Sequence, residues 1–166
     1  MKSTLKFHYP HFRLFIFFVL CAVVSGIGSM PIGAPPKAEK RIITTDKAPK
    51  AIGPYSQGVL VGDMLFVAGQ LGIDPATGKF SGDSTEAQTR QALRNIGEIL
   101  KAAGFDYKDV VQSTVYLKDL NDFQRLNAVY GEYFSADPPS RATVEVARLP
   151  RDARVEIVVV AMRTAR

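Results

Sequence analysis

The pattern of apolar and polar residues changes its period several times after residue 40, and each change marks an expected strand or helix. Short segments rich in β-branched, aromatic and other apolar residues are typical of strands. The expected strands are residues 41–45, 58–61, 64–68, 110–117, 142–147 and 154–162. Gly62 and Asp63 separate the second of these from the third, which predicts a tight hairpin. The last two strands are expected to form another hairpin, across residues 149–152.

Two segments instead place apolar residues three and four positions apart, which is the spacing of an amphipathic helix. Before and after the first of them, Asp83 and Glu86 are spaced as a capping box and Gly104 occupies a C-cap position. The apolar positions are Leu93, Ile96, Leu100 and Ala103 in the first helix, and Phe123, Leu126, Tyr130 and Phe134 in the second. The order β-β-β-α-β-α-β-β predicts an α+β domain with two helices on one face of a sheet.

The first 40 residues show a different pattern. A basic stretch ending at Arg13 precedes an apolar run over residues 14–24, which small residues follow. That order is typical of a secretory signal peptide, so we interpret residues 1–29 as a targeting segment for the periplasm or the secretory route, and residues 30–40 as a linker. A presequence for a mitochondrion or plastid and an uncleaved membrane anchor are the alternatives. Residues 41–166 are then a single domain, with no stable membrane contact once the N-terminus is removed.

Charge and residue usage exclude several classes of chemistry. The net charge of the chain is +5, but residues 41–166 hold 16 basic and 15 acidic side chains, so no nucleic-acid partner is expected. His8, His11 and Cys21 are the only histidines and the only cysteine, and all precede that domain. The domain therefore lacks a Cys/His zinc site, a disulfide and a Ser-His or Cys-His nucleophile pair. Any catalysis must come from other polar side chains or the backbone.

Two charged residues stand out because they occur in apolar strands. Arg141 begins such a segment, and its planar guanidinium suits a small carboxylate. The pattern alone favours the alternative, an edge arginine with its head in water or an ion pair with Glu145. Glu156 lies in a run apolar enough to be buried on both faces, where its pKa would rise toward that of a general base. The alternatives are a solvent-facing residue or a partner for Arg154. On one hairpin the two can be close.

Other polar or small residues interrupt apolar segments. Tyr55 follows Gly53-Pro54, where it can face a ligand or pack on the core. Gly69 lets a ligand approach the backbone or simply ends a strand. Asn127 interrupts a helix face, either at an interface or as an exposed amide. Taken alone, each of these residues fits a functional role and a structural one.

Taken together, the motifs of this chain resemble the Rid (YjgF-like) family in order and spacing, over essentially all of residues 41–166. The matching segments are Gly53-Pro54-Tyr55-Ser56-Gln57, Val67-Ala68-Gly69-Gln70, Gln88-Thr89, Asp119-Leu120-Asn121-Asp122-Phe123 with Asn127, Pro139-Ser140-Arg141-Ala142-Thr143-Val144-Glu145-Val146 with Leu149-Pro150, and Val155-Glu156-Ile157. Some family members carry Cys where this chain has Thr143, and Ser is frequent at the position of Ala68.

The resemblance implies a chorismate-mutase-like subunit with a mixed sheet, assembled as a homotrimer with active sites in clefts between subunits. It also implies a RidA-type deaminase that hydrolyses 2-aminoacrylate and related 2-imino acids to 2-keto acids and ammonia, with no metal and no organic cofactor. The residue matching Arg141 clamps the substrate carboxylate, and the one matching Glu156 activates the water. Those matching Tyr55, Gly69, Asn127 and Thr143 contact the substrate. An RNA-directed role as endoribonuclease or translation inhibitor, and a non-catalytic small-acid-binding or chaperone-like trimer, are the alternative functions.

Overall fold

The computed structural model describes residues 37–163, and the expected targeting segment and most of the expected linker lie outside them. The strands are β1 (Lys40–Ile43), β2 (Gly58–Val61), β3 (Met64–Leu71), β4 (Val110–Leu117), β5 (Ser140–Glu145) and β6 (Val155–Met162), and the helices are α2 (Thr85–Ala102) and α3 (Phe123–Tyr133). This is the element order predicted from the sequence, with short 3-10 turns added. None of the helices in residues 37–163 is long and apolar enough to cross a membrane.

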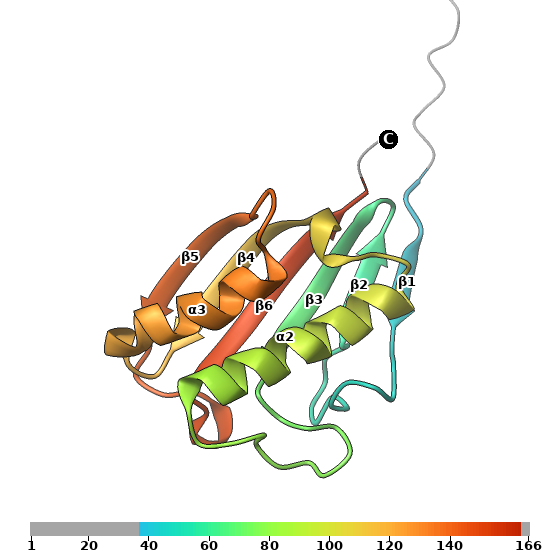
Figure 1. Cartoon of the computed structure of the whole chain (residues 1–166). Coiled ribbons are helices and arrows are strands. Elements are labelled where there is room, and N and C mark those ends of the chain that lie inside the picture. The colour runs from blue at the N-terminus through green and yellow to red at the C-terminus, as the bar shows by residue number, and fades with distance from the viewer. Residues whose placement is uncertain (1–36, 164–166) are drawn as a thin grey trace, which may run out of the picture. The chain divides into compact units, whose positions relative to one another are not determined.

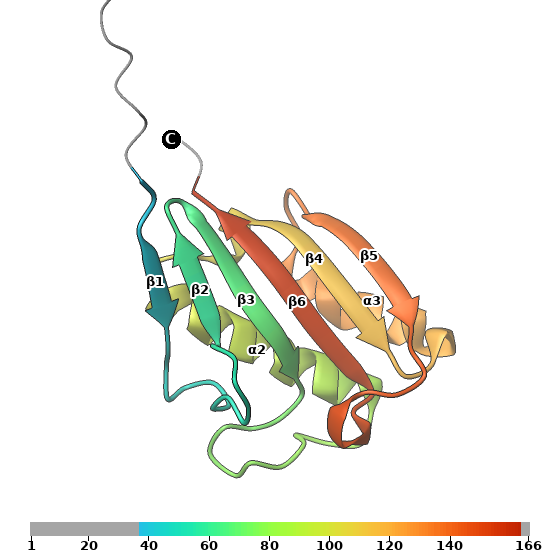
Figure 2. The same ribbon diagram turned by 180° about the vertical axis from the view of Figure 1, so that it is seen from behind.

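The described strands form one mixed sheet in the order β1-β2-β3-β6-β4-β5. Neighbouring strands are antiparallel except β4 and β5, which are parallel and joined through α3. A parallel pair needs such a crossover, because its second strand must start at the same end of the sheet as the first. Both described helices cover one face of the sheet (Figure 1), and the opposite face carries none (Figure 2).

The expected pairing of the last two strands is wrong. β5 bonds to β4 on one side, and β6 lies between β3 and β4, so β5 and β6 are not neighbours. We expected this hairpin because the connection between β5 and β6 is short. The crossover through α3 instead places β5 beside β4, on the side of β4 away from β6. The hairpin at Gly62 is confirmed: Val61 pairs with Met64, and Gly62 has a φ of +56°, which glycine adopts without strain.

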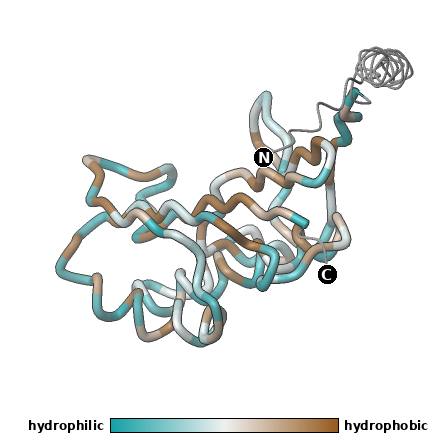
Figure 3. The backbone as a smooth tube through the Cα atoms, turned by 90° about the horizontal axis from the view of Figure 1, so that it is seen from above, coloured by the Kyte–Doolittle hydropathy of each residue, from teal (hydrophilic) through white to brown (hydrophobic). Residues whose placement is uncertain are grey.

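The core lies between the helices and the sheet. On α2 the predicted positions Leu93, Ile96 and Leu100 are fully buried, and Gly104 follows the helix with a φ of +79° as expected of a C-cap glycine. The helix cap is one residue later than predicted: the side chain of Ser84, not Asp83, accepts a hydrogen bond from the amide of Ala87. Figure 3 shows hydrophobic and hydrophilic segments alternating along the described chain.

The helix-free face of the sheet is apolar. β6 alternates buried and partly exposed residues, so its even-numbered positions lie on this face. Large apolar side chains that are 38–50% exposed on it are Ile42, Met64, Phe66, Val144 and Met162. An exposed apolar surface of this kind marks a region that another molecule covers.

Candidate functional site

The six residues singled out from the sequence fall into two groups in the structure. One, which we call the arginine group, consists of Arg141, Asn127 and Thr143 and lies between β5 and α3. The other, the glutamate group, consists of Gly69 and Glu156, which lie near the ends of β3 and β6, and of Tyr55 in the loop before β2.

Arg141 is held by one face of α3. Its Nη2 donates a hydrogen bond of 2.8 Å to Oδ1 of Asn127, and its guanidinium carbon lies 4.5 Å from the centre of the Tyr130 ring. The ring of Phe123 lies 5.6 Å away. Residues 123, 127 and 130 are spaced four and three apart, so they share a helix face and form a cradle for the cation. An aromatic ring and an amide hold a guanidinium without neutralising its charge.

Arg141 has no carboxylate partner within 4 Å among the described residues, whereas Arg90, Arg125, Arg148 and Arg154 all form ion pairs. Glu145, one alternative partner, accepts a hydrogen bond from the amide of Leu120 instead. The side chain is also half-buried, so it is not an edge arginine with its head in water. The remaining N–H groups of Arg141 can therefore anchor an anion.

Three hydroxyl groups lie around this cation, and two of them, those of Ser113 and Tyr130, were not connected with it from the sequence. The Oγ1 of Thr143, the Oγ of Ser113 and the phenol oxygen of Tyr130 are buried without a hydrogen-bond partner among the described residues. Burial raises the pKa of the Tyr130 phenol. Ser113 pairs with Arg141 across the parallel strands, which no local pattern reveals. Tyr130 was expected only as part of a buried helix face, which it also is.

Glu156 lies against an irregularity in β3. The pairing of β3 with β6 shifts between Val67 and Gln70, which is the mark of a β-bulge, and Gly69 lies within it. A Cβ on Gly69 would lie 2.8 Å from the carboxyl carbon of Glu156, so only glycine leaves room for this carboxyl group. The sequence predicted that Glu156 would be buried on both faces. It is half-buried, because strand β6 exposes alternate residues. Burial still raises the pKa of Glu156 above its usual range.

No ion pair to Glu156 is present among residues 37–163. Arg154, the alternative partner, lies 3.8 Å from Asp122 and donates to the carbonyl of Asp83. A carboxyl group with a raised pKa and no fixed cation is suited to accept and return a proton.

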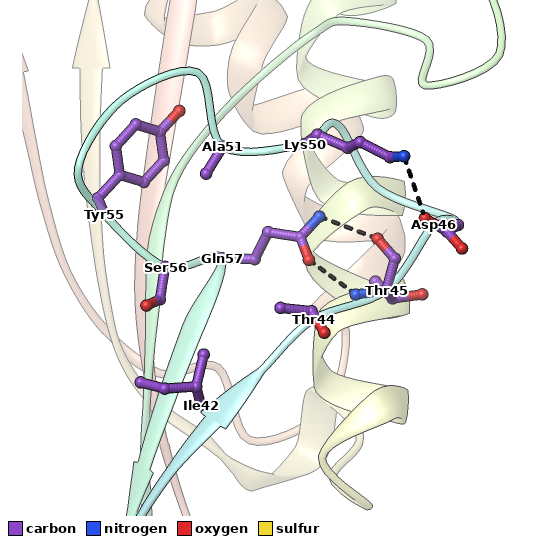
Figure 4. A pocket seen from close by; sticks show the side chains of 9 residues that line it. All are labelled: Ile42, Thr44, Thr45, Asp46, Lys50, Ala51, Tyr55, Ser56 and Gln57. Atoms are coloured by element: carbon purple, nitrogen blue, oxygen red, sulfur yellow. Dashed lines mark hydrogen bonds and ion pairs between the residues drawn. The ribbon is translucent and has the colours of Figure 1, made fainter.

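Tyr55 belongs to a loop that is fastened to the same region. Its side chain is 51% exposed, so it does not pack on the core, and its hydroxyl accepts a hydrogen bond from the amide of Ile52. The loop is fixed by Gln57, which exchanges two hydrogen bonds with the backbone of Thr45: its Oε1 accepts from the amide and its Nε2 donates to the carbonyl (Figure 4). The Nε2 of Gln57 also donates to the carbonyls of Ala48 and Pro49. The carbonyl of Gln57 also accepts a bond from the amide of Ala68, next to Gly69. The loop borders a cavity of about 440 Å³.

The two groups lie on opposite faces of the sheet. Arg141 pairs with Ser113, which faces the helices, whereas Glu156 pairs with Tyr116, which faces the other way. Strand β4 also separates them laterally, by about 10 Å at roughly 4.8 Å per strand. A small ligand therefore cannot contact Arg141 and Glu156 of the same chain. Within residues 37–163, no cluster of three or more His, Cys, Asp or Glu side chains could hold a metal ion.

Comparison with known proteins finds relatives over about three quarters of the chain. The family described as Endoribonuclease L-PSP matches residues 45–163. A RutC family protein of Saccharolobus solfataricus is 57% identical over 125 residues, which are 75% of this chain and 99% of that protein. The human 2-iminobutanoate/2-iminopropanoate deaminase is 48% identical over 124 residues, 75% of this chain and 90% of that protein. The crystal structure of E. coli TdcF with bound serine matches with a TM-score of 0.72 and 43% identity, covering 75% of this chain and 99% of that one.

Proposed function

The chain belongs to the Rid (YjgF) family, and from that we propose that it is an enamine/imine deaminase, which hydrolyses 2-aminoacrylate and related 2-imino acids to 2-keto acids and ammonia. The observation that carries the proposal is Arg141, a half-buried cation held by an amide and an aromatic ring, with no carboxylate partner among residues 37–163. A guanidinium in that state is suited to the carboxylate of a small acid. Relatives named as deaminases of 2-imino acids support the substrate class.

The reaction requires only orientation and one group that moves a proton. Water adds to C2 of the protonated imine, and Glu156 takes a proton from that water as the C–O bond forms, which leaves a neutral carbinolamine. Glu156 then returns this proton to the nitrogen, and the C–N bond breaks as the C=O bond forms. The hydroxyl proton of the carbinolamine leaves with the ammonia, as ammonium. The C=N bond is already electrophilic, so a positioned water and a carboxylate with a raised pKa are sufficient.

We further propose that the active site forms between subunits of a homotrimer of chorismate-mutase-like subunits. The arginine group of one chain and the glutamate group of another would then face one cleft, because the two groups of one chain lie on opposite faces of its sheet. A heterologous contact of this kind closes into a ring, with one site at each interface. The apolar residues of the helix-free face supply a surface for it.

The activity is tested by generating 2-imino acids in situ with an amino-acid oxidase and trapping them with semicarbazide. The protein should lower the yield of trapped imine in proportion to its concentration, with or without EDTA. No effect at micromolar protein contradicts the proposal, and so does a loss on EDTA treatment that zinc restores.

The shared site is tested by mixing chains. Arg141→Ala and Glu156→Gln chains are each expected to be defective, but a co-expressed mixture should recover roughly a quarter of wild-type activity, since each half-site is intact in half of the chains. Co-expression of Arg141→Ala with Arg141→Lys is the matched control and should recover little, because both changes affect the same group. A mixture of Arg141→Ala and Glu156→Gln chains that stays inactive excludes the shared site.

The family description also raises an RNA-directed activity. The 16 basic and 15 acidic residues after residue 40 leave little net charge for phosphate contacts. Cleavage of a structured RNA by the purified protein that survives Arg141→Ala and Glu156→Gln would favour that alternative.

A further inference from the structure

A cavity of about 350 Å³ lies beside Arg141, between α3 and the Pro138-Pro139 turn that precedes β5. Besides Arg141, it is lined by Asn127, Tyr130, Gly131, Phe134, Pro138 and Pro139. These residues offer mainly ring, proline and backbone carbon atoms, and Arg141 is the one charged side chain among them. A ligand that fits this lining carries an anionic group at one end and an apolar group at the other.

We propose that this cavity receives the side chain of the 2-imino acid, and that the enzyme therefore prefers apolar side chains larger than methyl, such as those derived from leucine or phenylalanine. The inference rests on the proposed function, because it places the substrate carboxylate on Arg141. Once the carboxylate is fixed there, the groups attached to C2 have to point along the walls that adjoin the guanidinium.

The size and polarity of the cavity set this preference. Pockets that bind small molecules span about 300–1,000 Å³ and are mostly apolar with a few polar groups, and this cavity lies at the lower end. A three-carbon acid such as 2-aminoacrylate leaves most of that volume unfilled. Each additional methylene buried against the wall favours binding by about fourfold. A charged side chain gains no partner there and loses its hydration.

Gly131 is an exposed glycine in the lining of the cavity. It lies in α3, where glycine is an unfavourable residue, and a Cβ added to it would meet no heavy atom within 4 Å. A larger side chain at this position can therefore extend into the open space without displacing the fold. We infer that Gly131 determines which substrate side chains are accepted.

The test compares Gly131→Leu with wild type on imines generated from alanine and from phenylalanine. Wild type should show the higher kcat/KM for the phenylalanine-derived imine, and Gly131→Leu should lower the phenylalanine-to-alanine ratio by about 10- to 200-fold. Gly131→Ala should give a smaller drop. Ala128→Leu is the matched control: it adds the same side chain to an exposed position of α3 that does not line the cavity, and should leave the ratio as in wild type.

Binding of the keto-acid products gives a second measurement that does not need turnover. Phenylpyruvate should bind wild type more tightly than pyruvate does, and Gly131→Leu should abolish that difference, with folding and assembly checked by circular dichroism and light scattering. An unchanged ratio in a folded, assembled Gly131→Leu protein overturns the inference. Absence of turnover with selective phenylpyruvate binding would refute the proposed reaction but leave the side-chain pocket standing. If Gly131→Leu does not assemble, the Gly131→Ala ratio decides.

Discussion

The arginine group lies between the last strand of the sheet order and a helix, whereas the glutamate group lies on the face that carries no helix. Arg141 is fixed by side chains: an amide oxygen at 2.8 Å and an aromatic ring at 4.5 Å, both from α3. The Glu156 carboxyl group instead lies against Gly69 in the bulge of β3, next to Ala68, whose amide donates a hydrogen bond to the carbonyl of Gln57.

This difference follows from what each charge needs. A guanidinium can be half-buried against neutral partners and keep its charge, because its pKa is far above neutrality. A carboxyl group under the same burial shifts toward its neutral form instead. One group is therefore a permanent anchor, and the other is a group that can exchange a proton. Substitution of Arg141 should therefore impair ligand binding, whereas substitution of Glu156 should impair proton transfer.

Glu156→Gln should have the largest effect. The amide keeps the shape and hydrogen-bonding reach of the carboxyl group but cannot accept the proton, so kcat should fall by about 100- to 10,000-fold. The dissociation constant for pyruvate should stay close to that of wild type, since the anchor is intact. Steady-state kinetics and calorimetry check the two quantities. A parallel loss of pyruvate binding would mean that Glu156 holds the ligand rather than acting on water.

Arg141→Ala should instead weaken ligand binding. Removing a charge-assisted bidentate contact in a desolvated site costs about 2–4 kcal/mol, which corresponds to roughly 30- to 1,000-fold in kcat/KM, and pyruvate binding should weaken alongside. Arg141→Lys should restore little, because an ammonium group lacks the planar fork. Wild-type activity in a correctly assembled Arg141→Ala protein would show that the arginine group is not part of the active site.

Gly69→Ala tests whether the bulge positions the carboxyl group. The added Cβ would overlap the present position of the Glu156 carboxyl, which has to move away. A displacement of this size should lower kcat by about 10- to 100-fold. In the Glu156→Gln background the same change should lower kcat no further. Additive losses in this double-mutant cycle would show that Gly69 acts independently of Glu156.

Much of the fold was predictable because it is locally encoded. The periods of apolar residues gave the order of strands and helices, and Gly62 and Gly104 marked a turn and a helix end. The neighbour of β5 was not predictable from the short connection to β6, since strand pairing is decided by non-local packing. The faces of Arg141 and Glu156 depend on that pairing, so their separation was also hidden.

The sequence supplied candidate site residues but not their geometry. The apolar pattern singled out Arg141 and Glu156 and left structural alternatives open for both, and the family resemblance implied their roles. Tyr130 escaped notice because its helical spacing already explained it as core, although its ring also contacts Arg141. Similarly, the bulge at Gly69 leaves no signal in a pattern of alternating residues.

Tyr130→Leu should have a moderate effect on the anchor. Loss of a cation–π contact costs about 0.5–2 kcal/mol, so the dissociation constant for pyruvate should rise by roughly 2- to 30-fold with a smaller change in kcat. Tyr130→Phe keeps the ring and removes a hydroxyl that has no partner among the described residues, so it should bind as wild type does. Equal losses in both variants would assign the effect to the hydroxyl.

The smallest expected effect concerns the pH dependence of stability. Because burial raises the pKa of Glu156 in the folded protein, the unfolded chain loses this proton first as the pH rises, and the contribution of Glu156 to stability falls through that window. Glu156→Gln removes the dependence. The comparison is best made in the Arg141→Ala background, since a neighbouring chain's arginine would favour the charged carboxylate and oppose the shift. The unfolding temperatures of Arg141→Ala and Arg141→Ala/Glu156→Gln should be nearly equal at about pH 4, with the glutamine variant increasingly more stable toward about pH 8. A difference that instead shrinks or reverses as the pH rises would mean that Glu156 is stabilised as a carboxylate within its own chain, and the contrast with Arg141 would lose its physical basis.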